Sequence, residues 1–121
     1  MKIADWNIAE MTGYEPKTTF YTDFSIAEAF GTDAIRDTFE RAFNEWKTDT
    51  EYITELVMAL NWKSWEHHDR ALYAEECNDQ LASDTHTDLC ELYCSLYEEA
   101  DAWCMDNLKD DDLAYFIRTT D

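Results

Sequence analysis

His86, Cys90 and Cys94 follow one another at intervals of four residues, the most suggestive spacing of metal-ligating side chains in this sequence. A helix would place the imidazole and the two thiols along one side, and zinc accepts both kinds of ligand. Cys77 or His67 could supply a further ligand. Structural zinc sites usually combine cysteine pairs from two segments, however, and the chain contains no Cys-x-x-Cys. Because cysteines beside an apolar helix face generally pack as small hydrophobic residues, the sequence predicts no metal and no cofactor.

Side chains suited to catalysis do not form a recognisable motif. No serine is flanked by glycines as in a nucleophile elbow. The two glycines, Gly13 and Gly31, are too few for a glycine-rich phosphate loop. The Glu-x-x-His motif that builds carboxylate metal centres in helical bundles is absent. The sequence therefore predicts a protein that is not an enzyme.

Acidic residues form the strongest pattern. The chain has 28 Asp and Glu residues against nine Lys and Arg, a formal net charge of −19 at pH 7. Between residues 75 and 112, thirteen of these acids accompany a single base, Lys109. With the helical period of about 3.6 residues, many of them fall opposite the side that contains Leu89, Leu96 and Ala100. The predicted acidic face consists of Asp84, Asp88, Glu91, Glu98, Glu99 and Asp106, extended by Asp110, Asp111 and Asp112.

A face of this charge restricts the choice of partner. Direct binding to nucleic acid or to an anionic membrane requires a basic surface, so the sequence predicts neither. Steps of three or four residues advance a helix by about 4.5 to 6 Å, comparable to the spacing of phosphates along a DNA strand. We therefore expect the carboxylates to bind a basic, nucleic-acid-binding protein as a DNA mimic. A simpler interpretation, a solvated helix face, stays open at this point.

The preceding helix carries a second candidate surface. Met58, Trp62 and Trp65 project from the side nearly opposite Ile53 and Leu60. A helix that is apolar on both sides is usually buried, but Trp and Met are also enriched at interfaces. In the second case the protein would be a helical interaction module, and its acidity would serve solubility.

The elements that must position these residues are helices. A chain of 121 residues with 45% hydrophobic residues suffices for one domain over residues 1–121. Residues 1–22 lack a helical period and predict an irregular N-terminal arm. Residues 23–121 predict a small bundle of four to five helices, so the expected fold class is all-α.

One helix boundary matters for the predicted acidic face. Residues 48–51 have the spacing of a capping box and should start a long helix that continues to about Ser83. A connection at residues 84–87 would follow, and a threonine within it would cap the acidic helix. The apolar residues of that helix keep the helical period to Leu108.

The sequence also sets expectations about location. It has neither the features of a signal peptide nor an apolar stretch long enough to span a membrane, so we expect a cytoplasmic protein. In that compartment the four cysteines should be free thiols.

Three blocks, DFSIAEAFG, RAFNEWKTDTEYITELVMALNWKSWEHH and LAYFIRTTD, resemble those of a family of short acidic proteins from mobile elements and prophages of Gram-positive gut bacteria. The resemblance supplies no activity. It implies a genomic context, because such elements often carry proteins that inhibit restriction or CRISPR defence. Several of those proteins are acidic DNA mimics. The expected partner is accordingly a nucleic-acid-binding host defence protein, and the expected function is anti-restriction or anti-CRISPR inhibition.

Overall fold

The computed structural model describes residue 10 and residues 12–120. These residues contain five α-helices and no β-strand: α2 (Phe20–Glu28), α3 (Thr32–Trp46), α4 (Thr50–Glu76), α5 (Gln80–Asn107) and α6 (Asp110–Thr120). The all-α prediction is therefore confirmed for the described part of the chain. No helix within it is both long enough and apolar enough to cross a membrane.

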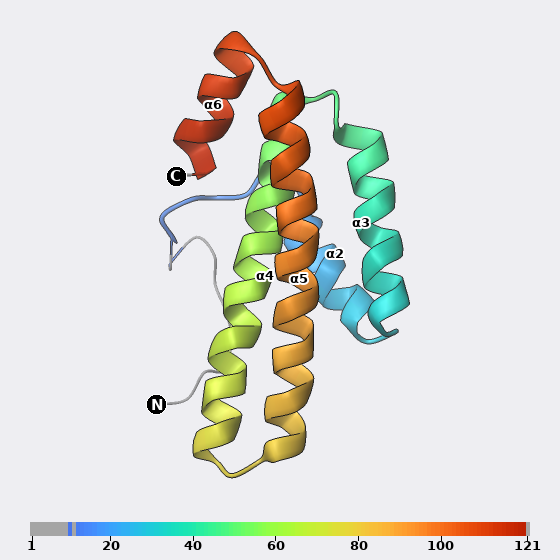
Figure 1. Cartoon of the computed structure of the whole chain (residues 1–121), viewed down its shortest axis with the longest axis vertical. Helices are drawn as coiled ribbons and strands as arrows, with labels where there is room; N and C mark the ends of the chain where they lie inside the picture. Colours follow the sequence, from blue (N-terminus) through green and yellow to red (C-terminus); the bar gives the residue numbers. More distant parts are fainter. Residues whose placement is uncertain (1–9, 11, 121) are drawn as a thin grey trace.

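Helices α4 and α5 form a long antiparallel pair, and the shorter helices pack along it (Figure 1). Asp49 caps α4 by accepting a hydrogen bond from the backbone N–H of Tyr52. Asp79 caps α5 in the same way through the N–H of Ala82. Helix α4 therefore begins within the predicted capping box at residues 48–51, but its capping residue is Asp49 and not the first residue of that box.

The predicted position of the connection between these two helices is wrong. The sequence placed it at residues 84–87, which lie inside α5. The chain turns earlier because Asn78 adopts a φ of +59°, the left-handed conformation that ends a helix. Thr85 and Thr87 cap nothing, since their hydroxyls donate to carbonyl groups four residues earlier in the same helix. The acidic helix is longer than predicted, and all six of its expected face residues belong to it.

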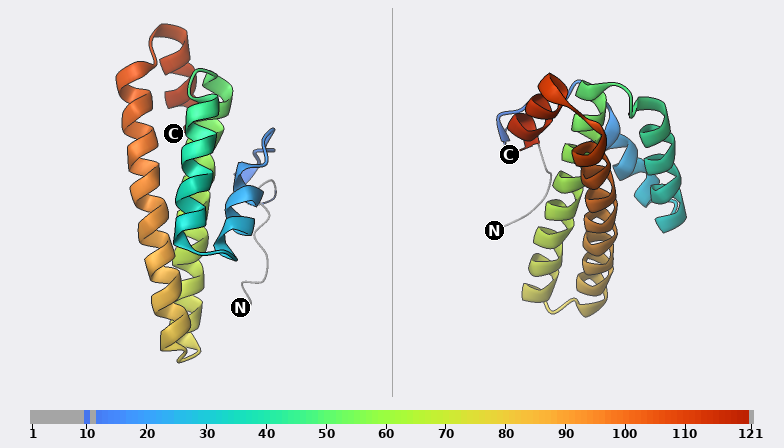
Figure 2. Two further views of the ribbon diagram at one scale, coloured as in Figure 1. Left: turned by 90° about the vertical axis from the view of Figure 1, so that its right-hand side faces the viewer. Right: turned by 45° about the horizontal axis from the view of Figure 1, so that its top comes forward.

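The hydrophobic core is one continuous cluster to which each of the five helices contributes. Apolar residues at helical spacing on α3 and α5 are buried in this cluster, including Ile35, Phe39, Leu92, Leu96 and Ala100. Figure 2 shows α6 folded back from the end of α5, where it packs against α4. The core therefore lies along the α4–α5 pair and leaves the outer side of α5 uncovered.

One buried carboxylate holds the segment before α2 to the rest of the protein. Glu55, which is 2% exposed, accepts hydrogen bonds from the backbone N–H groups of Lys17 and Thr18. The hydroxyl groups of Thr18 and Tyr14 donate to the same carboxylate. A segment without helical hydrogen bonds needs such an acceptor for its backbone donors. Residues 1–9 of the predicted irregular arm lie outside the described residues, and α2 begins within its last part.

Replacing Glu55 with alanine should therefore lower the free energy of unfolding by about 2–4 kcal/mol, because the backbone donors lose a charged acceptor. Glu51→Ala is the matched control: its exposed carboxylate pairs with Lys17 at 3.3 Å. Such a surface pair contributes less than about 1 kcal/mol. Urea denaturation followed by circular dichroism measures both variants. Equal losses would contradict the role assigned to Glu55.

Candidate functional site: an acidic helix face and a buried ion network

All nine residues of the predicted acidic face lie on the surface. Six belong to α5, three form the first turn of α6, and each of the nine is exposed. Within residues 10 and 12–120, no Lys, Arg or His forms an ion pair with any of them. Asp84 accepts a hydrogen bond from Gln80 at 2.7 Å. These carboxylates are therefore not neutralised by cations of the described part of the chain.

Burial of the opposite side of α5 fixes the direction in which these carboxylates point. The buried side chains include Leu92, Tyr93, Leu96, Ala100 and Cys104. At a rise of about 1.5 Å per residue, the acidic residues of α5 extend over roughly 33 Å. The three aspartates of α6 lie at the positive end of that helix, where its dipole stabilises negative charge.

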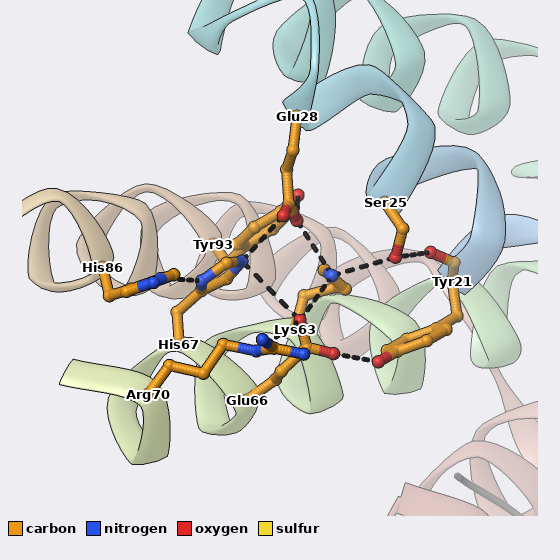
Figure 3. A network of polar contacts seen from close by, with 9 residues as sticks. All are labelled: Tyr21, Ser25, Glu28, Lys63, Glu66, His67, Arg70, His86 and Tyr93. Carbon is orange, nitrogen blue, oxygen red and sulfur yellow. Dashed lines mark hydrogen bonds and ion pairs between the residues drawn. The ribbon is translucent and has the colours of Figure 1, made fainter. Parts of the chain in front are cut away.

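A charged lysine lies in the interior between α2, α4 and α5 (Figure 3). The ammonium of Lys63 lies 2.9 Å from a carboxylate oxygen of Glu28 and 2.9 Å from one of Glu66, and it donates to Ser25 at 3.0 Å. It also lies 4.8 Å from the ring centroid of Tyr21, which donates its hydroxyl to Glu66. An isolated ammonium would be costly at 1% exposure, so these partners are what allow a charge in the core.

Two side chains of α5 join this network. Tyr93 donates its hydroxyl to Glu28 at 2.6 Å, and Nδ1 of His86 lies 2.9 Å from Nδ1 of His67. One Nδ1 must carry the proton and the other accept it, so the two rings cannot both be doubly protonated. Nε2 of His67 lies 3.0 Å from a carboxylate oxygen of Glu28. The network therefore ties α5 to both α2 and α4.

The network also determines which of its groups are ionised. Burial alone would raise the pKa of Glu28, but His67, Lys63 and Tyr93 stabilise the carboxylate and lower its pKa to about 2. Burial raises the pKa of Tyr93, and the charge of Glu28 raises it further. Burial and the neighbouring His67 lower the pKa of His86. At neutral pH the Glu28 carboxylate and the Tyr93 hydroxyl thus have the protonation states that their hydrogen bond requires.

Three residues of the network have donor atoms near enough to one another for metal ligation. The donor atoms of Glu28, Glu66 and His67 lie within 4.8 Å of one another. Carboxylates and imidazole suit zinc. However, Lys63 lies 2.9 Å from both carboxylates and already balances their charge, so an added ion would lie beside an ammonium. The geometry favours an ion-pair network over a metal centre.

The cysteines singled out by their spacing have other neighbours. The hydroxyl of Ser64 on α4 lies 2.9 Å from Sγ of Cys94 and 3.6 Å from Sγ of Cys90. His86 instead stacks on His67, with ring centroids 5.1 Å apart. All four cysteines of the chain are free, as the sequence predicted. The three residues therefore do not form one site. Cys90 and Cys94 lie beside Ser64, whereas His86 belongs to the ion network.

Met58, Trp62 and Trp65 do not form one exposed patch. Trp62 is 8% exposed and lies against Tyr14, with ring centroids 6.0 Å apart. Met58 is half-buried and packs against the core. Trp65 is 55% exposed and meets the ring of His68 edge to face. Of the three residues, Trp65 alone offers a large accessible surface.

The ion network was not predicted from the sequence, although part of its signal is visible there. Lys63, Glu66, His67 and Arg70 continue the helical spacing of Leu60, so four polar residues occupy positions where the helix is otherwise buried. Buried charges are paired, which could have prompted a search for partners. The α2 partner of this group has no spacing relation to α4, so the sequence alone could not identify it.

No protein-family model, curated protein or solved structure matches this chain. The resemblance to acidic proteins of mobile elements therefore stays a prediction.

Removing the buried cation should destabilise the protein strongly. We expect Lys63→Met to lower the free energy of unfolding by about 3–5 kcal/mol, because two buried carboxylates lose their cation. Lys17→Met, which removes only an exposed lysine paired with Glu51, should cost less than about 1 kcal/mol. Adding Glu66→Gln to Lys63→Met should recover part of the loss in urea denaturation. Similar losses for the two lysine variants would show that the Lys63 network does not hold the helices together.

Acidification should remove the stabilisation that Glu28 provides. Its pKa is about 2 in the folded protein and 4.5 at its ordinary value, so the unfolded chain takes up the proton first. The contribution is complete above pH 4.5 and is lost as the pH falls toward 2. Between neutral pH and about pH 3, the stability difference between the wild type and Glu28→Gln should shrink by on the order of 2 kcal/mol.

The comparison with Glu28→Gln largely cancels the effect of protonating the surface carboxylates, which both proteins share. Urea titrations at matched ionic strength measure the difference at each pH. A difference that stays constant throughout would mean that Glu28 is not stabilised in its ionised form.

Proposed function

We propose that this protein is a non-enzymatic inhibitor whose acidic face on α5 and α6 occupies the nucleic-acid-binding surface of a basic protein. The observation that carries the proposal is the exposure of all nine carboxylates, none of them paired with a cation of the described residues. In a protein of net charge −19, the six residues on α5 form a long row along one side of that helix. Such a row can take the place of DNA phosphates.

The arrangement of the face supports this mode of binding. The six α5 carboxylates are fixed to one 28-residue helix, which is anchored from behind by the core and by the Lys63 network. A rigid scaffold lowers the ordering cost that a flexible acidic segment would incur on binding. Carboxylates at helical steps of about 4.5 to 6 Å then meet the Lys and Arg residues that normally contact phosphates.

The finer parts of the proposal follow from the charge and from the family resemblance. The helices would act as one bundle in a cytoplasmic protein, and the partner would be a restriction, CRISPR or other host defence protein. Long-range attraction between opposite charges speeds association, and salt weakens it. Inhibition should therefore be competitive with DNA and sensitive to ionic strength.

The aromatic interaction module is the weaker candidate. Its predicted surface on α4 is interrupted because Trp62 is buried, which leaves Trp65 as the exposed aromatic residue of the three. No further observation favours a partner at this position. We therefore retain the acidic face as the proposed binding surface.

The proposal is tested by capture from a bacterial host lysate at low salt on the immobilised protein, with elution by duplex DNA. The expected result is recovery of a nucleic-acid-binding protein that DNA displaces. The triple variant Glu91→Lys, Glu98→Lys and Asp106→Lys should weaken its binding at least about tenfold, because three attractive contacts become repulsive.

A control variant separates the acidic face from net charge. Glu15→Lys, Glu40→Lys and Glu76→Lys changes the charge by the same amount at exposed positions outside the face. This control should retain most of the binding. Equal weakening by the two triple variants, or a partner that excess DNA leaves bound, would argue against phosphate mimicry by this face.

A further inference from the structure

A groove lies between α2 and α3, apart from the acidic face. It has a volume of about 600 Å³, and both of its walls are helices. The two helices lie side by side and are joined by the short turn at residues 29–31 (Figures 1 and 2). Ile26, 59% exposed, and Phe30, 78% exposed, both line this groove. Two large apolar side chains this exposed, Ile26 on α2 and Phe30 in the turn that follows it, indicate a surface suited to binding.

The groove has the dimensions of a helix-binding site. The lining residues of α3 run from Ala34 to Trp46 at steps of three and four, so one complete face of this helix forms a wall. That face is about 18 Å long, which matches about 12 residues of a bound helix. Ala34 and Ala42 are small, which allows a second helix to approach closely, and Trp46 supplies an aromatic contact at one end.

Charged residues around the groove define the chemistry of its occupant. Asp23, Asp37 and Glu45 line it together with one base, Arg41, which leaves a local charge of −2. The exposed apolar side chains of Ile26 and Phe30, with acidic side chains beside them, are complementary to an amphipathic helix that carries an apolar stripe flanked by lysine or arginine. A second copy of this chain fits poorly, because a net charge of −19 opposes self-association.

We propose that the α2–α3 groove binds an amphipathic helix with basic flanks, about three turns long, that belongs to the basic protein recognised by the acidic face. The proposal rests on the proposed function only in taking the partner to be basic. It adds a second contact, in which apolar side chains of the partner cover Ile26 and Phe30. The acidic face would then provide charge attraction, and the groove would provide shape recognition.

The test uses a synthetic helical peptide of about 14 residues, with leucines at helical three- and four-residue steps and lysines beside them. It is titrated into the full-length, ¹⁵N-labelled protein at about 0.1 M salt, where exposed long-range charge effects are partly screened. The expected result is a set of chemical-shift changes centred on α2 and α3. A peptide of the same composition with its apolar stripe scrambled, and one with glutamate in place of lysine, should each bind at least about tenfold more weakly.

Matched variants locate the contact. The double variant Ile26→Ser and Phe30→Ser should weaken binding at least about tenfold, since it removes two apolar contacts from exposed positions. Leu81→Ser is the control, because Leu81 is 79% exposed but does not line the groove. It should leave the affinity unchanged. The wild-type amide spectrum outside the substituted helix confirms that each variant is folded.

The outcomes separate this inference from the proposed function. If the peptide shifts the α5 resonances and its affinity depends on Glu91, Glu98 and Asp106 but not on Ile26 and Phe30, the acidic face binds and the groove proposal is wrong. If the groove variants abolish binding while the acidic-face variants do not, the groove proposal stands even if DNA mimicry fails. Dimerisation in sedimentation experiments that Phe30→Ser abolishes would assign the groove to a second copy and overturn the proposal.

Discussion

The placement of the helices depends on the ion pairs and hydrogen bonds made by the buried ammonium of Lys63. It lies on α4, between Glu28 of α2 and Glu66 one turn away, and Tyr93 of α5 donates to the same Glu28 carboxylate. Apolar contacts permit small rotations of one helix against another, whereas a buried charge loses much of its compensation when its partners move. Because the network fixes the rotation of α5, it also fixes the direction in which the carboxylates on the opposite side of that helix point.

In the described part of the chain, ionised side chains are paired with opposite charges in the Lys63 network but not on the acidic face. In the Lys63 network, the carboxylates of Glu28 and Glu66 lie beside Lys63, with Arg70 3.5 Å from Glu66, so positive and negative charges are close to balance. On the acidic face no balancing cation is present among the described residues. Mutual repulsion of surface carboxylates destabilises the folded state. The hydrophobic core, to which each of the five helices contributes, offsets this loss of stability. An unbalanced surface on a balanced interior is what a protein that binds through charge requires.

The sequence predicted the parts of this structure that depend on local spacing. The helical period predicted most of α5 and its apolar side, and it correctly assigned the acidic residues of that helix to the opposite, exposed side. The end of α4 was mispredicted because the polar segment at residues 84–87 looked more like a connection than the turn at Asn78. The partners of Lys63 and Glu55 come from segments distant in the chain, so no periodicity could reveal them. The sequence left open whether Trp62 is buried or accessible, because only the three-dimensional structure shows Tyr14 against it.

In the proposed mode of binding, the acidic face and the α2–α3 groove would supply different components of recognition. A row of carboxylates attracts any basic surface and speeds encounter, but charge alone discriminates poorly among nucleic-acid-binding proteins, all of which have basic grooves. An apolar groove discriminates by shape, because a partner without a matching apolar stripe would leave Ile26 and Phe30 in water. Since a net charge of −19 also repels acidic proteins and other copies of the chain, the two proposed surfaces would together select partners that are both basic and able to present an apolar helix. Selectivity would then come chiefly from the groove, and the rate of association chiefly from the acidic face.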